Sequence, residues 1–302
     1  MSVIKESRTD RVFQMFVYVF LIIILIMVLY PLVYVISASI SDPKLVHSGE
    51  MWLWPMGFNV EGYKLILEYE QIWVGYRNTI LYTILGVSIN LFVTLPAAFA
   101  LAQNKLVGRN LFMMMLVFTM FFSGGLIPTY LLVKNLGLIN TVWAMVLPNA
   151  AAVWNIILCT TFFRVTIPKE LTEAAVIDGC STTKMFLRIV LPLSMPIIAV
   201  MSLFYGVGHW NEYFSALIYL SDESKYTLQL VLRQILVLQE LGNDNVQSTI
   251  TSTTAEAMQH RQTLAEIMKY SVIIVSTLPM IIAYPFLQRF FVKGVMIGSL
   301  KG

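Results

Sequence analysis

The sequence predicts an all-α integral membrane protein with six transmembrane helices. Two observations lead to this fold class. Of the 302 residues, 58% are apolar and only 12% are charged, whereas a soluble domain carries about 25% charged residues. The apolar residues also gather in six runs. The length of each run is close to the roughly 20 residues that a helix needs to cross a bilayer. Because lipid offers no partner for open backbone groups, these runs are expected to be helical.

The expected spans follow one another along the whole chain. They cover residues 12–37, 79–102, 111–132, 142–163, 193–211 and 270–288. The first run reaches Ile40, which exceeds the about 7–15 residues of a signal-peptide core, so it is interpreted as a retained helix. Kinks are predicted at Pro31, Pro96, Pro128, Pro148, Pro196, Pro279 and Pro285. Neighbouring helices can satisfy the carbonyls that such kinks free.

The distribution of Lys and Arg predicts the orientation, because basic residues are enriched in cytoplasmic loops. With the N-terminus inside, 12 of the 20 Lys and Arg residues fall in the inner segments. The inner loop 103–110 has two in eight residues, and the outer segment 41–78 has three in thirty-eight. We therefore expect a multi-pass membrane protein with both termini in the cytoplasm.

Several functions are disfavoured by what the sequence lacks. The net charge is only +3 and no basic stripe with interleaved aromatics is present, which argues against a nucleic-acid partner. Cys159 and Cys180 have no metal-ligand spacing and cannot build a disulfide framework. The predicted spans contain no Asp, Glu, Lys, Arg or His except His209, which lies near the outer end of the fifth span, whereas ion-coupled carriers keep such residues at depth.

No energy-supplying or catalytic motif is found either. The chain contains no Gly-Lys dipeptide, so it lacks the phosphate-cradling loop G-x-x-x-x-G-K-[ST]. The zinc motif H-E-x-x-H is also missing. We therefore expect no catalytic residue, no metal site and no cofactor in this chain, and a source of energy outside it.

The inner loop between the fourth and fifth expected spans holds the most informative pattern. Pro168 suits the first turn of a helix, and Glu170 lies close to its positive end. A short helix is expected over residues 169–178, with Gly179 as a natural stop. A second helix is expected from about Thr182 to Val190, ending at Pro192.

Within this loop the sequence reads EAA-x3-G-x9-I-x-LP, from Glu173 to Pro192. This pattern resembles the EAA loop of the type I permeases of ABC importers. In that family the loop forms a coupling helix that docks on a cytoplasmic ATPase subunit. The resemblance implies that the following residues couple to the ATPase: Glu170, Glu173, Ala174, Ala175, Asp178 and Gly179.

The alternative for this loop is an amphipathic helix lying on the inner leaflet. Such a helix would favour Lys and Arg on its polar face, but here Glu170, Glu173 and Asp178 occur instead. These acids suit a protein partner better.

The resemblance extends over nearly the whole chain. The chain is similar to carbohydrate-uptake permeases, among them the maltose importer's second permease and the lipoprotein-associated oligosaccharide permeases of Gram-positive bacteria. The matching stretches are Arg77-Asn78-Thr79 and residues 121–141, 209–220 and 291–302. The outer segment 221–262 is longer than in the maltose relative, and in such proteins a loop there reaches into the binding protein.

The resemblance implies three regions and a set of partners. Residues 1–76 would hold the cytoplasmic N-terminus, first span and outer loop, 77–290 the type I transmembrane domain, and 291–302 a cytoplasmic tail. The implied partners are a second homologous permease, two cytoplasmic ATPase subunits that hold ATP and Mg²⁺, and an extracellular solute-binding lipoprotein. The implied substrate is an oligosaccharide. Alternatives are another solute, such as an amino acid or polyamine, and a channel or ion-driven carrier that works alone.

A sugar pathway should be neutral, polar and aromatic, because aromatic faces stack on sugar rings and amides bond to hydroxyls. The candidates in the spans are Asn90, Trp154, Asn155, Tyr205, Trp210 and Asn211. Asn90 and Asn155 have a structural alternative as hydrogen-bonding groups between helices. The structural alternative for Trp210 is that its side chain anchors the helix at the membrane interface.

Overall fold

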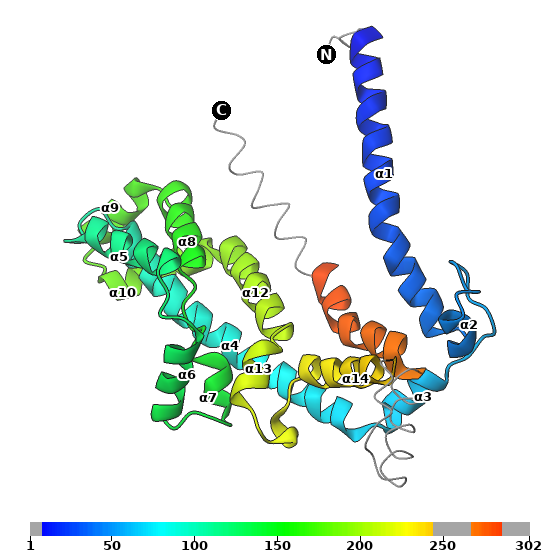
Figure 1. Cartoon of the computed structure of the whole chain (residues 1–302). Helices are drawn as coiled ribbons and strands as arrows, with labels where there is room; N and C mark the ends of the chain where they lie inside the picture. Colours follow the sequence, from blue (N-terminus) through cyan, green and yellow to red (C-terminus); the bar gives the residue numbers. More distant parts are fainter. Residues whose placement is uncertain (1–7, 244–266, 286–302) are drawn as a thin grey trace. The chain divides into compact units, whose positions relative to one another are not determined.

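The computed structural model describes residues 8–243 and 267–285 (Figure 1), and within them the side chains of 9–237 and 267–285. All regular elements in these ranges are helices, which confirms the all-α class. The chain divides into two compact units, one of residues 1–69 with 234–277 and the other of residues 70–233 with 278–302.

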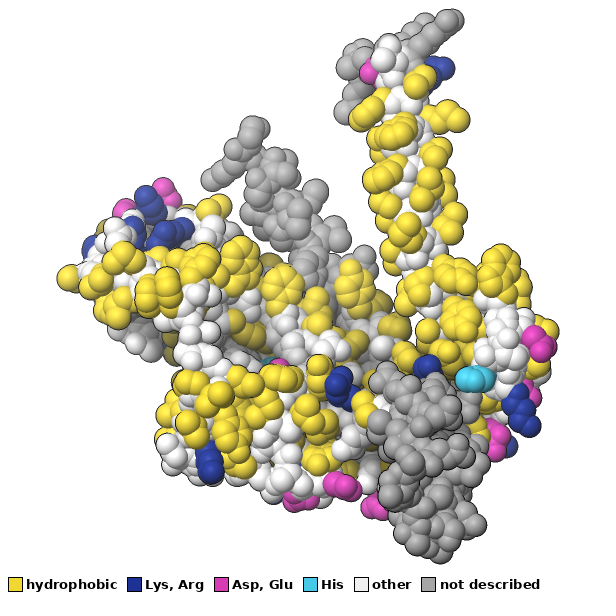
Figure 2. Space-filling model, in the orientation of Figure 1, with side chains coloured by type: hydrophobic (Ala, Val, Ile, Leu, Met, Phe, Trp, Pro, Cys, Tyr) yellow, Lys and Arg dark blue, Asp and Glu magenta, His cyan; other side chains and the backbone are white. Residues whose placement is uncertain are grey.

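The first unit contains one long, exposed apolar helix. Helix α1, Arg8–Ser39, includes Pro31 without a break. Its exposed side chains are hydrophobic at nearly every position from Val12 to Leu32, and Figure 2 shows this for the face in view. Two short helices follow, α2 at Pro43–His47 and α3 at Glu61–Glu68. An apolar surface on all sides is what a lipid-facing helix requires.

The second unit is built on α4, Glu70–Ala102, the longest helix of the unit. Helix α8, Val153–Thr166, and helix α12, Met195–Trp210, both pack against it. Their shared core is apolar and includes Phe99, Phe163 and Met201. Pro96 lies inside α4 and does not end it.

Two expected spans are not continuous helices. The prediction of one helix over 111–132 is wrong: α5, Arg109–Phe121, and α6, Leu126–Asn135, are bent by 109°. The bend falls at Gly124–Gly125, where Gly125 has a φ of 87° that no helix accommodates.

The prediction of one helix over 142–163 is wrong as well. Helix α7 is Val142–Val146, and α8 begins only at Val153. Pro148 lies in the gap, and its ring removes an amide donor and crowds the preceding turn. The non-helical residues 147–152 are called the α7–α8 break below.

The remaining elements complete the inner loop and the outer segment. Helices α9, Lys169–Ile177, and α10, Thr182–Met185, lead through a π-helical turn at Phe186–Val190 into α11, Leu191–Leu193. After α12 come α13, Phe214–Tyr219, a 3₁₀ turn at Glu223–Lys225, α14, Leu228–Asn243, and a helix over Ile267–Pro285. The stretch Thr182–Leu193 is bent by 81° against α12.

Three helices of the described chain are long and apolar enough to cross a membrane, at Thr9–Ser39, Glu70–Ala102 and Ile267–Pro285. The count rises to five if each bent pair forms one span. The six-span count stays a prediction. The expected tail 291–302 and much of the outer segment 221–262 lie outside the described residues.

Candidate functional site

The expected stop at Gly179 is confirmed, and its geometry explains the spacing of the sequence pattern. Gly179 has a φ of 69°. The N–H of Cys180 donates to the carbonyl of Ala175 at 2.9 Å, and the N–H of Gly179 donates to that of Val176 at 3.0 Å. These two bonds form a Schellman motif, in which the residue after the helix adopts the left-handed conformation. The separation of four residues between Ala175 and Gly179 in the sequence pattern therefore matches the end of α9.

Helix α9 presents most of its side chains outward. Ala175 is buried, whereas Glu170, Glu173 and Ala174 are exposed. Ile177, with 85% of its surface exposed, is one of the most exposed apolar residues of the chain. Charged side chains gather at the end of the second unit formed by α5 and α9 (Figure 2). A short helix with exposed acids and an exposed isoleucine suits a protein partner.

A hollow of about 1020 Å³ lies beside α9. One wall comes from the end of α4 and the following loop, including Phe99 and Lys105. The other wall includes Lys169, Glu173 and Ile177 of α9. The hollow keeps one side of α9 accessible to a partner.

The two helices behind α9 are joined where they end. Arg164 Nη2 of α8 donates to the carbonyl of Leu101 in α4 at 2.8 Å. This carbonyl belongs to the last turn of α4, which has no partner within the helix. The arginine therefore ties α8, from which the inner loop starts, to the central helix.

A polar cluster is buried between α4, α12 and the α7–α8 break. Asn90 is fully buried, and its Nδ2 donates to the carbonyls of Asn149 at 2.7 Å and Ala150 at 2.9 Å. Its Oδ1 lies 2.7 Å from Nε2 of His209. One amide side chain thus satisfies two backbone carbonyls of the break and one imidazole.

Two further pathway candidates are buried in the same unit. Tyr205 shares a hydrogen bond of 2.6 Å with Thr94 Oγ1. Asn155 is 8% exposed, and no hydrogen bond to it is found within the described chain. Asn155 therefore keeps its amide groups available.

The other three candidates differ in exposure. Trp154 is 60% exposed. Trp210 is 5% exposed, and its ring centre lies 6.2 Å from that of Tyr76. Asn211 is exposed, and its Nδ2 donates to the carbonyl of Val207 at 2.9 Å, within the same helix end. Contact of any of the six candidates with a sugar stays a prediction.

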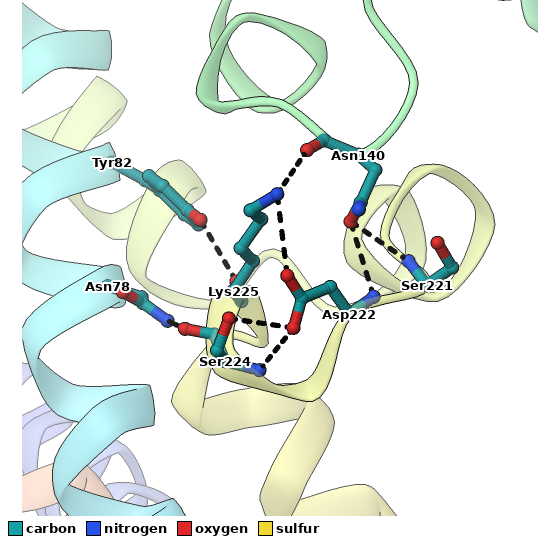
Figure 3. Close-up of polar contacts among 7 residues, drawn as sticks. All are labelled: Asn78, Tyr82, Asn140, Ser221, Asp222, Ser224 and Lys225. Carbon is teal, nitrogen blue, oxygen red and sulfur yellow. Dashed lines mark hydrogen bonds and ion pairs between the residues drawn. The ribbon is translucent and has the colours of Figure 1, made fainter.

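A network that sequence reasoning missed joins three segments far apart in the chain (Figure 3). Asn140 has a φ of 60°, a conformation that Asn tolerates better than most residues. Its Oδ1 accepts from the N–H groups of Ser221 at 3.3 Å and Asp222 at 3.2 Å, and its carbonyl accepts from Lys225 Nζ at 3.0 Å. The loop after α6 is thereby fastened to the loop after α13.

The stretch Arg77-Asn78-Thr79 fastens the same outer loop to α4. Asn78 Nδ2 donates to the carbonyls of Ser224 at 2.8 Å and Tyr226 at 3.0 Å. Thr79 Oγ1 accepts from the N–H of Leu228 at 2.8 Å. Sequence reasoning noticed this stretch only as a resemblance, and its role here is to close the backbone hydrogen bonds of a loop.

Asp222 carries the main charge of this outer network. The hydroxyl and the N–H of Ser224 donate to its carboxylate at 2.7 and 3.0 Å, and Lys225 Nζ lies 3.4 Å from it. The two Ser224 bonds, together with Lys225, lower the pKa of the Asp222 carboxyl below its ordinary value of 3.8. Within residues 8–243 and 267–285, no three His, Cys, Asp or Glu side chains gather as a metal ion would require.

Comparison with known proteins matches this architecture along nearly its full length. The family model described as "Binding-protein-dependent transport system inner membrane component" covers residues 72–297. Protein LplC of Bacillus subtilis (strain 168) is 39% identical over 296 residues, which cover 98% of this chain and 97% of LplC. The polygalacturonan/rhamnogalacturonan transport system permease protein YtcP of the same strain is 38% identical over 293 residues, 97% of this chain and 99% of YtcP.

A solved structure agrees with the sequence relatives. One chain of a bacterial ABC transporter involved in the import of the acidic polysaccharide alginate is similar with a TM-score of 0.83 and 31% identity. The similarity covers 96% of this chain and 100% of that chain. The chain therefore belongs to the family of inner membrane components of binding-protein-dependent transport systems.

Proposed function

We propose that the chain is a permease subunit of an ATP-driven importer that brings a carbohydrate, most simply an oligosaccharide, across a bacterial cell membrane. The observation that carries this proposal is the full-length similarity to permeases named for polygalacturonan/rhamnogalacturonan transport and alginate import. A further relative is named for arabinooligosaccharides. These names do not favour the amino-acid or polyamine alternative.

In the proposed complex, solute passage, ATP hydrolysis and sugar delivery are carried out by different chains. A second permease completes the pathway, two cytoplasmic ATPase subunits hold ATP and Mg²⁺, and an extracellular lipoprotein delivers the sugar. In this chain six spans cross the membrane with both termini inside. The orientation is supported by the excess of Lys and Arg in the inner segments.

In this proposal α9 is the coupling helix. Its outward acids Glu170 and Glu173, its Ala174 and the Schellman turn at Gly179 form a rigid projection on the inner side. Closure of the ATPase pair would move this projection, and the Arg164–Leu101 bond would pass the movement to α4 and α8. The transport cycle then alternates access between the two sides of the membrane.

A charge reversal on α9 tests the proposal. In the reconstituted complex, Glu173→Lys is expected to abolish ATP-dependent carbohydrate uptake, while the lipoprotein still binds its sugar. The matched control is Glu68→Lys, a reversal at an exposed acid of α3, which should keep uptake. Normal transport by Glu173→Lys would reject the coupling role.

Two further outcomes would reject the proposal as a whole. The first is a wild-type complex that imports no carbohydrate, with neutral and uronate oligosaccharides both offered. The second is transport by the purified chain alone in liposomes, which would favour the stand-alone channel or carrier.

A further inference from the structure

The α7–α8 break lies at membrane depth. A helix rises about 1.5 Å per residue, so Val153 lies roughly 17 Å along α8 from Arg164, the residue bonded to the end of α4. The hydrocarbon core of a bilayer is about 30 Å thick. If Arg164 marks one face of the membrane, the break falls near the midplane, whichever face that is. Tilt of α8 from the membrane normal shortens this depth, which keeps the break close to the midplane.

The backbone of the break is only partly satisfied. Asn90 bonds the carbonyls of Asn149 and Ala150, and the N–H of Ala150 donates to the carbonyl of Leu147 at 3.1 Å. The N–H and carbonyl of Ala151 find no partner in the described chain. Lipid tolerates no such backbone, and irregular segments occur at depth only where protein or a water-filled cavity covers them.

Polar and aromatic side chains gather at the same place. Asn149 in the break is exposed. Trp154 and Asn155 follow in the first turn of α8, and 60% and 8% of their surfaces are exposed. No hydrogen bond to the Asn155 amide is found in the described chain, and its atoms are not among the fully buried unpaired ones, so they can meet a ligand with both donors and acceptors. Sugar hydroxyls have both, and an indole face suits the apolar face of a sugar ring.

From these contacts we infer that the α7–α8 break is a sugar-contacting element of the pathway. Asn149 and Asn155 bind hydroxyls, and Trp154 stacks on a ring. Asn90 is a positioning residue: it touches no sugar and holds the break open through Asn149 and Ala150. The inference that the break contacts sugar rests on the proposed function. The inference that the break lines a water-filled cavity does not.

Cysteine accessibility tests the lining. The chain has two cysteines, so Cys159→Ala with Cys180→Ser gives a cysteine-free parent. Into this parent Asn149→Cys and Trp154→Cys are introduced singly. The control is Phe92→Cys, because Phe92 lies two residues from Asn90 in α4 and is an 80% exposed apolar side chain. A charged, membrane-impermeant thiosulfonate is applied to the assembled importer in proteoliposomes, and labelling is followed by mass.

The N149C and W154C variants are expected to react at least tenfold faster than F92C and to be protected by the sugar-loaded lipoprotein. Reaction with a lipid-soluble maleimide alone, or with neither reagent, would overturn the inference, because the break would then face lipid or a sealed protein interface. If the wild-type complex imports no carbohydrate, the proposed function fails, while the labelling pattern still decides the lining.

The positioning role of Asn90 has its own readout. Adding Asn90→Ala to the N149C variant should change the labelling rate at that position at least threefold. Adding Asn135→Ala, at an exposed amide in the last position of α6, should leave the rate unchanged. Equal rates in both combinations would show that Asn90 does not position the break.

Asn155→Leu should reduce uptake at least tenfold while the lipoprotein still stimulates ATP hydrolysis, and full uptake would remove Asn155 from the sugar site.

Discussion

His209 Nε2 lies 2.7 Å from Asn90 Oδ1, with both side chains buried between α4 and α12. The Nδ2 of Asn90 already donates to two carbonyls, so its Oδ1 is free only to accept. His209 must therefore donate, which places a hydrogen on Nε2. The cluster closes without a charge on either side chain, as a buried polar cluster should, because burying an unpaired charge is costly.

The first prediction concerns the stability of this cluster. Asn90→Ala leaves the carbonyls of Asn149 and Ala150 and the imidazole N–H of His209 without partners. We expect the free energy of unfolding to fall by about 1–3 kcal/mol, given the cost of buried unsatisfied groups and the smaller average of about 0.6 kcal/mol for hydrogen bonds in membrane proteins. Denaturation of the purified chain in detergent measures it.

A double-mutant cycle with His209→Ala isolates the shared bond. The double variant should be less destabilised than the sum of the two single variants. The surface amide Asn211→Ala serves as the control and should change stability by less than about 0.5 kcal/mol. Additive effects of the two buried substitutions would contradict a direct Asn90–His209 bond.

The second prediction concerns Gly86, which allows α12 to approach α4. A Cβ at Gly86 would overlap the imidazole ring of His209, whereas a Cβ at Gly208 would meet no atom within 4 Å. Alanine is favoured over glycine in a helix by about 1 kcal/mol. Gly208→Ala should therefore be neutral or stabilising, and Gly86→Ala should destabilise by about 1–3 kcal/mol through overpacking. Thermal unfolding compares the pair, and equal melting temperatures would refute the close approach.

The third prediction concerns the turn that ends α9. Gly179 and Gly137 have φ values of 69° and 68°, and neither has an atom within 4 Å of a built Cβ. Both end a helix with the same bond pattern, since Leu138 donates to Val133 as Cys180 does to Ala175. Alanine at either position costs about 1–2 kcal/mol of local backbone energy.

Equal local costs should have unequal effects on transport. Gly179→Ala is expected to reduce ATP-dependent uptake severalfold. Gly179→Asn should reduce uptake less, because Asn tolerates positive φ. Gly137→Ala should hardly reduce uptake. Uptake by the reconstituted complex measures the order. Equal losses from Gly179→Ala and Gly137→Ala would mean that α9 has no special part in coupling.

Local chemistry made part of this fold predictable from sequence. The helix over 169–178 and its stop at Gly179 depend on residues within a single turn, so the pattern predicts them well. The break at 147–152 depends on distant residues. Pro31 and Pro96 lie within continuous helices, yet near Pro148 the helix is interrupted, and there Asn90, more than fifty residues away, bonds the freed carbonyls.

The candidate site shows the same division. The acids of α9 are visible as a local pattern. The role of Asn140 is not visible in the sequence, because its partners Ser221, Asp222 and Lys225 lie about eighty residues away. The only local signal was an Asn in a short loop, where positive φ is tolerated. In the proposed complex, the second permease also lines the pathway, so this chain's sequence alone does not determine which side chains meet a sugar.

The fourth prediction concerns pH and the outer network around Asp222. The bonds from Ser224, aided by Lys225, favour the ionised carboxylate, so its pKa in the folded chain lies below the ordinary 3.8. A group whose pKa is lowered by folding stabilises the fold above its unfolded value, and this contribution is lost as pH falls through the folded value. The contribution of Asp222 should thus be constant from neutral pH down to about 4, begin to fall near 3.8, and vanish only below the folded pKa.

Asp222→Asn separates this contribution from other effects of acid. The amide keeps the shape of the side chain but accepts more weakly from Ser224 and carries no charge for Lys225. Above pH 4 the variant should melt at a lower temperature than the wild type, and below 3.8 the two curves should converge. The control is Asp10→Asn, at an exposed residue in the first turn of α1. A difference that persists unchanged at pH 3 would contradict the lowered pKa, since a protonated Asp222 resembles the amide in charge.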